Sequence, residues 1–151
     1  MVRPQPPFTV LIVEDEALLA LDLEAMVTDC GHTVVGEAMS LSDVEALGGL
    51  TGPDIAFVDM NLADGSNGLE VSHFIRRHWP DTAIVFITAN PAAIPVDFAG
   101  AYGVIAKPFS QIGLTSAMRF IEEGISDPPP KSGRPASFVP SPHIAEAWNA
   151  A

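Results

Sequence analysis

Residues 8–16 read Phe8-Thr-Val-Leu-Ile-Val13-Glu14-Asp15-Glu16, a nearly continuous apolar run that stops at three acids. A short run rich in β-branched residues is typical of a strand that is covered on both faces in a parallel sheet. From Glu16 to Cys30 the apolar residues broadly follow helical spacing, and Gly31 stands where a helix terminator is expected. The sequence therefore predicts a buried strand followed by a helix.

The same alternation repeats along the chain. We predict further strands over residues 33–38, 54–59, 83–88 and 103–106, and helices over residues 42–47, 68–78, 93–101 and 110–123. Pro91 and Pro95 should shorten the third of these helices or make it irregular, because proline donates no backbone hydrogen bond. Strands that alternate with helices imply right-handed crossovers, and so an α/β fold with a doubly wound, five-stranded parallel sheet and helices on both faces.

Charge and composition exclude several classes of protein. Nineteen acidic against seven basic residues give the 151-residue chain a formal net charge of −12, which disfavours nucleic acid as a partner. No run of apolar residues is long enough to span a membrane, and the N-terminus does not resemble a signal peptide. Cys30 is the only cysteine and cannot form an internal disulfide, so we expect a cytoplasmic protein.

The chain divides into three parts. Residues 1–7 contain three prolines and are predicted to be a flexible N-terminal segment, and residues 8–123 form the domain. Residues 124–151 contain six prolines, so we expect most of this tail to be disordered or polyproline-like. Trp148 lies near its end and could dock on a partner or on the domain itself, although disorder is the favoured expectation.

Five chemically active side chains follow the ends of the predicted strands: Glu14, Asp15, Asp59, Thr88 and Lys107. In open α/β sheets ligands bind beyond the carboxyl ends of the strands, so these side chains should face one site. Crowded carboxylates repel one another unless a cation lies among them, and their hard oxygen ligands suit Mg²⁺. Asp59 could then act as a nucleophile towards phosphorus, with Lys107 as a second positive charge.

Four motifs carry a family resemblance: Val13-Glu14-Asp15-Glu16, Phe57-Val58-Asp59-Met60-Asn61-Leu62, Ile87-Thr88-Ala89 and Ala106-Lys107-Pro108-Phe109. Together they resemble the CheY-like receiver domain of bacterial two-component response regulators, of the stand-alone type. The resemblance implies a flavodoxin-like sheet of order 2-1-3-4-5. It also implies that Asp59 is the phosphoacceptor.

The same resemblance implies the other site roles. Glu14, Asp15 and Asp59 would hold Mg²⁺ together with the backbone carbonyl of Asn61. Thr88 would be the switch hydroxyl, Lys107 would contact the phosphoryl group, and the bond to Pro108 would be cis. The family commonly has Tyr or Phe two residues before the lysine, but this chain has Ile105. We therefore expect the signal to be transmitted by repacking around Ile105 or to be weaker than in relatives.

The function that follows is a phosphoacceptor switch rather than an enzyme. A histidine kinase or a histidine phosphotransfer protein would phosphorylate Asp59, and the result would be altered binding to a downstream protein, by a monomer or a weak phosphorylation-linked dimer. The alternative is a receiver-like scaffold or adaptor that binds partners independently of phosphate. A haloacid-dehalogenase-type phosphatase is disfavoured, because its paired acids follow the first strand, whereas this chain has Asp59-Met60-Asn61 after the third.

Overall fold

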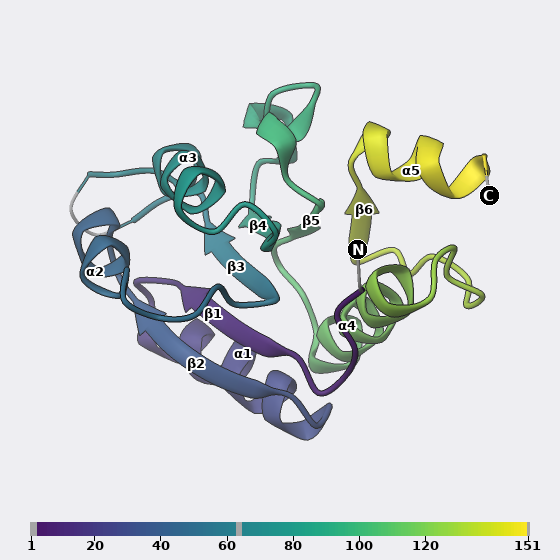
Figure 1. Cartoon of the computed structure of the whole chain (residues 1–151), viewed down its shortest axis with the longest axis horizontal. Coiled ribbons are helices and arrows are strands. Elements are labelled where there is room, and N and C mark those ends of the chain that lie inside the picture. Colours follow the sequence, from purple (N-terminus) through teal and green to yellow (C-terminus); the bar gives the residue numbers. More distant parts are fainter. Residues whose placement is uncertain (1–2, 63–64, 151) are drawn as a thin grey trace.

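The computed structural model describes residues 3–62 and 65–150 of the chain. Within these ranges six strands form one sheet of order β2-β1-β3-β4-β5-β6, in which all neighbours are parallel except β5 and β6 (Figure 1). The strands are β1 (Thr9–Val13), β2 (Thr33–Ala38), β3 (Ile55–Asp59), β4 (Ala83–Thr88), β5 (Gly103–Ala106) and β6 (Phe138–Pro140). The order 2-1-3-4-5 agrees with the sequence-based prediction, and β6 is an additional edge strand.

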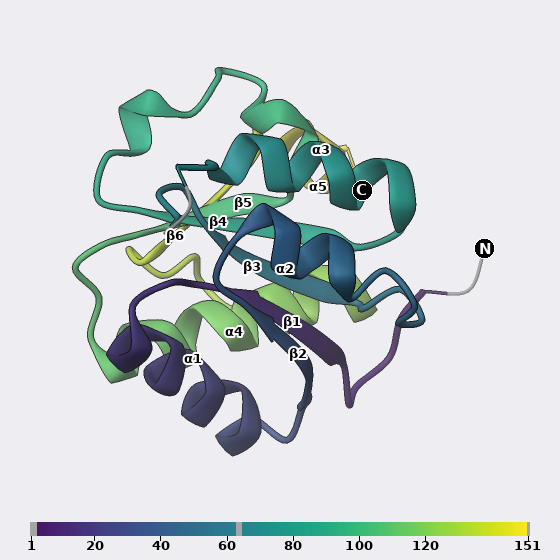
Figure 2. The ribbon, with the colours of Figure 1, turned by 90° about the vertical axis from the view of Figure 1, so that its left-hand side faces the viewer.

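Helices cover both faces of the sheet (Figure 2). They are α1 (Ala17–Asp29), α2 (Leu41–Ala46), α3 (Gly68–His78), α4 (Gln111–Ser126) and α5 (Pro142–Asn149). Side chains of Ser40, Asn67 and Ser110 each accept the backbone N–H of the third residue of α2, α3 and α4. Ser40 therefore caps α2, which begins one residue before the predicted start at residue 42.

The core consists of two layers, one on each face of the sheet. Side chains alternate between the faces along each strand, because successive Cβ atoms point to opposite sides. Val10, Ile12 and Phe57 pack with α1 and α4 on one face, whereas Leu11 and Val58 pack with α2 and α3 on the other. All five side chains are fully buried. This double coverage fixes the register of the parallel strands and so the positions of their carboxyl ends.

The segment between β4 and β5 differs from the prediction of a helix over residues 93–101. It contains two 3₁₀ turns, η1 (Pro91–Ala93) and η2 (Phe98–Gly100), in place of an α-helix. Pro91 and Pro95 lack the N–H groups that a continuous helix needs, and Phe98 and Ala99 adopt positive φ angles of 56° and 51°. The helix predicted over residues 93–101 is replaced by these two turns, and the irregularity expected from the two prolines is what the structure shows.

The C-terminal tail also differs from the disorder that its composition suggested. Phe138–Pro140 form β6, which pairs antiparallel with β5, and Pro142–Asn149 form α5. Both elements lie at the β5 edge of the sheet, opposite β2 (Figure 1). Four prolines precede β6, so the composition pointed to disorder, whereas burial of a few aromatic side chains orders the segment. Residues 1, 2 and 151 of the predicted terminal segments lie outside the described residues.

Among the described residues no helix combines the length and the apolar character that crossing a membrane requires.

Candidate functional site

The carboxyl ends of four strands bring the five predicted site residues to one edge of the sheet. Glu14 and Asp15 follow β1, and Asp59 ends β3, the neighbour of β1. Thr88 ends β4, and Lys107 follows β5 directly. The Lys107 N–H donates to the Thr88 carbonyl at 2.8 Å, which ties the last two strand ends together.

Three carboxylates form an acidic cluster at this edge. One oxygen each of Glu14, Asp15 and Asp59 can be chosen so that all three lie within 4.8 Å of one another. Glu14 and Asp59 are only 3% and 4% exposed, so water screens their charges poorly, whereas Asp15 is half-buried. Such a cluster needs positive charge or bound protons to be stable.

Lys107 supplies one positive charge. Its Nζ donates to Asp59 Oδ2 at 3.0 Å and lies 3.7 Å from Glu14 Oε1. Burial alone would lower the pKa of Lys107, but the hydrogen bond to Asp59 and the negative charges of Glu14, Asp59 and Glu16 raise it above its ordinary value. The side chain is therefore a firmly charged ammonium at the centre of the site.

Glu14 shows that one ammonium does not balance three acids. Burial, followed by the proximity of Asp59, raises the pKa of Glu14 to about 8, although the Glu16 N–H and Lys107 lower it. Its Oε2 accepts the Glu16 N–H at 3.1 Å, whereas the buried Oε1 has no hydrogen-bond partner. A buried oxygen without a hydrogen bond beside two other carboxylates is a fitting ligand for a divalent cation of the Mg²⁺ type.

Backbone N–H groups hold the side chains of Asp59 and Thr88 in place. The Asn61 N–H donates to Asp59 Oδ1 at 3.0 Å, so both carboxylate oxygens of Asp59 have a donor. Thr88 Oγ1 accepts the Asn90 N–H at 3.0 Å. The peptide bond between Lys107 and Pro108 is cis. Ile105 lies fully buried in the core layer beneath α4, where it pairs with Phe138 of β6.

A shallow pocket of about 470 Å³ adjoins the acidic cluster. Glu14 and Asp15 form one part of its wall, and Leu21 of α1 and Met39, which follows β2, form another. Leu21 and Met39 are 59% and 51% exposed, so this wall of the pocket offers apolar surface to solvent. The pocket thus joins an apolar surface to the acidic cluster.

The sequence analysis missed two backbone hydrogen bonds of the site. The backbone N–H groups of Glu16 and Asn90 fix Glu14 and Thr88, but donation by a backbone group leaves no mark on residue identity. The exposed Leu21 and Met39 were missed for a different reason. Apolar residues on a helix or after a strand are ordinarily counted as core, and only the packed structure shows that these two face outwards.

Comparison with known proteins identifies the class that this sheet and site define. Residues 10–119 match the response regulator receiver domain family, and the chain belongs to that family. It is accordingly a signalling module of two-component systems and not a classical enzyme. Receiver domains generally bind Mg²⁺ at a cluster of acidic residues, and Glu14, Asp15 and Asp59 form such a cluster.

Individual relatives agree with this assignment. The phyllosphere-induced regulator PhyR of Methylorubrum extorquens is 33% identical over 111 residues, which cover 72% of this chain and 41% of PhyR. The transcriptional regulatory protein PdtaR of Mycobacterium tuberculosis is 31% identical over 114 residues, 74% of this chain and 55% of PdtaR. The solution structure of the PhyR receiver domain of Erythrobacter litoralis superposes with a TM-score of 0.65 at 28% identity, covering 74% of this chain and 86% of that domain. The chain thus spans about half or less of the length of these two curated relatives.

Proposed function

We propose that the chain is a phosphoacceptor switch, in which Asp59 receives a phosphoryl group and the modified protein changes its binding to a partner. The observation that carries the proposal is the arrangement around Asp59. Its carboxylate lies among Glu14 and Asp15, receives a hydrogen bond from Lys107 at 3.0 Å, and is next to a buried glutamate oxygen that lacks a hydrogen bond. An ion pair that only stabilised the fold would need one carboxylate beside Lys107, whereas this site has three.

The chain's own residues can perform the transfer. An oxygen of Asp59 attacks phosphorus, the new O–P bond forms, and the bond from phosphorus to the donor nitrogen or oxygen breaks. The ammonium of Lys107 already contacts Asp59 and would stay close to the added phosphoryl oxygens. Glu14, Asp15, Asp59 and the carbonyl of Asn61 would hold Mg²⁺, which neutralises phosphoryl charge when it is bound.

Thr88 and Lys107 would report the arrival of the phosphoryl group. Thr88 is 3% exposed at the end of β4, and its hydroxyl hydrogen is free to reorient, because the oxygen only accepts in the Asn90 contact. The backbone link from Lys107 to Thr88 passes any displacement to β5. Ile105 occupies the fully buried position two residues earlier, so transmission would require repacking of the core around it.

The donor that fits is a histidine kinase or a histidine phosphotransfer protein, as family membership implies. The apolar side chains of Leu21 and Met39 beside the acidic cluster support docking of a protein donor at this edge. The downstream target is a protein, in line with the chain's net charge of −12, which disfavours nucleic acid. Solved PhyR chains from Bartonella quintana are described as anti-anti-sigma factors, which makes a regulator of transcription one target class to test.

Incubation of the full chain with Mg²⁺ and acetyl phosphate tests the acceptor role. We expect the mass to rise by one phosphoryl group that is stable in acid and labile in alkali, and we expect Asp59→Asn to abolish this uptake. Asp54→Asn is the matched control, because Asp54 lies just before the other end of β3, where it accepts the Thr9 N–H. Uptake that persists in Asp59→Asn would show that a different residue is the acceptor.

A phosphate-independent scaffold is the second candidate, and the buried Ile105 in the usual aromatic position favours it. It predicts no uptake from acetyl phosphate or from any histidine kinase of the host. It also predicts unchanged partner binding in Asp59→Asn. A phosphotransfer profile against the host kinases therefore separates the two functions and names the donor at the same time.

A further inference from the structure

The C-terminal tail is docked on the β5 edge through backbone pairing. Ile105 pairs with Phe138, Val104 with Val139 and Gly103 with Pro140. Beyond β6 the Ser141 N–H donates to the Tyr102 carbonyl at 2.9 Å. Before β6 the Ser137 hydroxyl donates to the Gly113 carbonyl at 2.8 Å. These contacts extend the sheet by one short strand, as in β-strand addition.

Four aromatic rings hold the tail against the domain. Tyr102 and Phe120 belong to the domain, and Phe138 and Trp148 belong to the tail. The Phe120 ring centroid lies 5.9 Å from that of Phe138 and 5.5 Å from that of Trp148. The Tyr102 centroid lies 6.2 Å from Phe138 and 6.0 Å from Trp148. Tilted and edge-to-face pairs at such distances are favourable beyond simple area burial.

Two glycines, Gly103 of β5 and Gly124 of α4, leave space for the rings of Phe138 and Trp148. At Gly103 the three atoms nearest to an added Cβ all belong to β6, and the Phe138 ring would clash with it. At Gly124 an added Cβ would lie 2.7 Å from Trp148 Cζ2 and would clash with the Tyr102 hydroxyl. Gly103 and Gly124 both have ordinary negative or extended φ angles, so the backbone does not require glycine there. At Gly103 the close approach of the tail does, and at Gly124 the Tyr102 hydroxyl and the Trp148 ring do so together.

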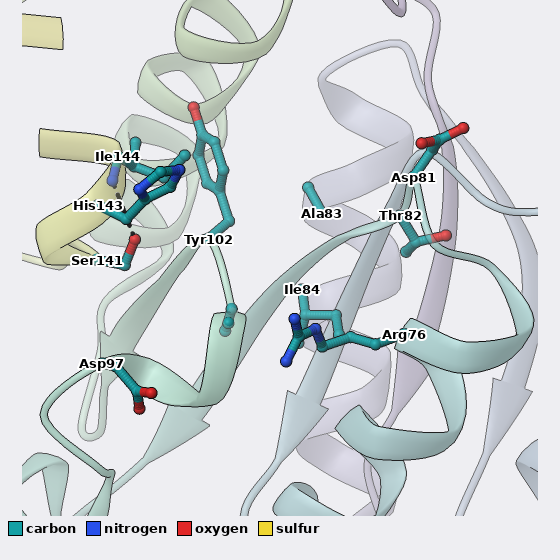
Figure 3. Close-up of a pocket in the computed structure, with 12 residues that line it drawn as sticks. Arg76, Asp81, Thr82, Ala83, Ile84, Asp97, Tyr102, Ser141, His143 and Ile144 are labelled. Atoms are coloured by element: carbon teal, nitrogen blue, oxygen red, sulfur yellow. Dashed lines mark hydrogen bonds between the residues drawn. The ribbon is translucent and has the colours of Figure 1, made fainter. Parts of the chain in front are cut away.

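The docked tail is nevertheless attached unevenly. Phe138 is fully buried, whereas none of the eight residues of α5 is. Between α5 and the domain lies a pocket of about 590 Å³, in which His143 and Ile144 of α5 face Arg76 and Asp97 across open space (Figure 3). The buried hydroxyl of Tyr102 has no hydrogen-bond partner. An unsatisfied buried hydroxyl is unfavourable, so undocking would return a hydrogen bond to Tyr102.

We propose that the β5 edge, with Gly103, Gly124 and the Tyr102 and Phe120 rings, is a strand-docking surface that residues 134–149 occupy until a partner displaces them. The surface is complete without the tail, since it consists of residues of β5, α4 and the turn before β5. The tail is an intramolecular occupant that competes with external ligands. Its linker keeps it at an effective concentration on the order of millimolar, so only a ligand that matches its contacts can replace it.

The partner that fits is a protein with an extended segment that adds antiparallel to β5. The segment needs an aromatic side chain over Gly103 and a second aromatic residue that reaches Gly124, as Phe138 and Trp148 do. A hydrogen-bond acceptor near the Tyr102 hydroxyl would give it an advantage over the tail, which offers none. Strand pairing supplies affinity in such complexes, and the side-chain positions supply specificity.

A labelled synthetic peptide of residues 134–149 tests the proposal on full-length chains, without Mg²⁺ or phosphodonor. Phe138→Ala/Trp148→Ala removes the tail's anchors but leaves the surface intact. Gly103→Ala also dislodges the tail but blocks the surface. We expect the peptide to bind the double variant at least about tenfold more tightly than the wild type, which its own tail protects, and not to bind Gly103→Ala. Val139→Ala is the control, since this β6 side chain is 43% exposed.

Hydrogen exchange of the Ser141 amide reports tail docking directly, because this N–H donates to Tyr102. Protection should be lost in both dislodged chains and kept in Val139→Ala. If the double variant fails to fold, Trp148→Ala alone replaces it, because α5 has no fully buried residue.

Three results would overturn the proposal. The first is equal peptide affinity for the wild type and the dislodged double variant. The second is a double variant that does not bind the peptide although its Ser141 amide has lost protection from hydrogen exchange. The third is Ser141 protection that depends on protein concentration, because a second copy would then supply the strand. The proposal does not need phosphorylation of Asp59, so these outcomes are independent of the acetyl phosphate experiment.

Discussion

Lys107 Nζ lies 3.0 Å from Asp59 Oδ2, so the residue that would sense a phosphoryl group already contacts the residue that would carry it. Modification of Asp59 must rearrange this ion pair, and the backbone of Lys107 links the rearrangement to Thr88 and β5. The pair thus connects the acidic cluster to the residue that directly follows β5.

Lys107→Ala should uncouple phosphorylation from the structural response. The three carboxylates remain, so we expect Mg²⁺ binding to persist, and acetyl phosphate should still modify Asp59 at a reduced rate. The change in backbone hydrogen exchange of β5 on phosphorylation should be lost, because one phosphoryl contact is missing. A full exchange response in Lys107→Ala would contradict the role assigned to this ammonium.

Asp15→Asn should weaken the binding of Mg²⁺. Asp15 contributes one of three carboxylates whose ligand oxygens lie within 4.8 Å of one another, and loss of a unit charge at such a distance corresponds to roughly tenfold or more in affinity. Isothermal titration with Mg²⁺ measures the effect. Asp22→Asn on the exposed side of α1 is the control and should bind Mg²⁺ like the wild type. Equal affinities in both variants would remove Asp15 from the metal site.

Stability of the metal-free protein should fall as pH rises from 4.5 to about 8. Burial and Asp59 raise the pKa of Glu14 from 4.5 to about 8, so the folded chain keeps a proton that the unfolded chain releases. This stabilisation is fully present below 4.5 and is lost as pH rises through 8.

Urea unfolding in the presence of a chelator measures this dependence, and Glu14→Gln should flatten it. Saturating Mg²⁺ should flatten it as well, because the cation takes the place of the proton. An identical pH dependence in Glu14→Gln and wild type would place the buried proton elsewhere.

The single tyrosine of the chain provides a spectroscopic test of tail docking. Burial raises the pKa of Tyr102, whose phenol lies beneath the tail. Dislodging the tail with Phe138→Ala/Trp148→Ala should lower the tyrosine pKa towards its ordinary value of about 10, because water then reaches the hydroxyl. Absorbance titration of tyrosinate measures the shift. An unchanged titration curve would mean that the tail does not cover this hydroxyl in solution.

The sequence predicted the sheet and the acidic cluster because both depend on strongly patterned segments. Apolar runs that stop at charged residues define β1 and β3, and the fold then places Glu14 and Asp59 at a common edge. Between β4 and β5 the sequence predicted a shortened or irregular helix, since Pro91 and Pro95 disfavour a regular one, but the pattern does not specify the two 3₁₀ turns that form instead. The conformation of such a segment depends on the balance between local propensities and tertiary packing.

The tail shows a different limit of sequence reasoning. Judged by composition alone, its six prolines favour disorder. What orders it is a long-range match between Phe138 and Gly103 and between Trp148 and Gly124, and no local pattern encodes either pair. A glycine in a strand is normally read as a weakness of that strand. Here the missing side chain at Gly103 is what admits the neighbouring strand.

Antiparallel β6 also determines what the molecule presents to its own copies. An open β5 would offer a row of unpaired backbone groups, the usual template for aggregation by sheet extension. The docked strand covers that row, and because it is only three residues long and ends in Pro140, it offers little template of its own. Undocking of the tail without a partner therefore exposes β5 to pairing with other copies. It lowers solubility in addition to losing the packing of the tail.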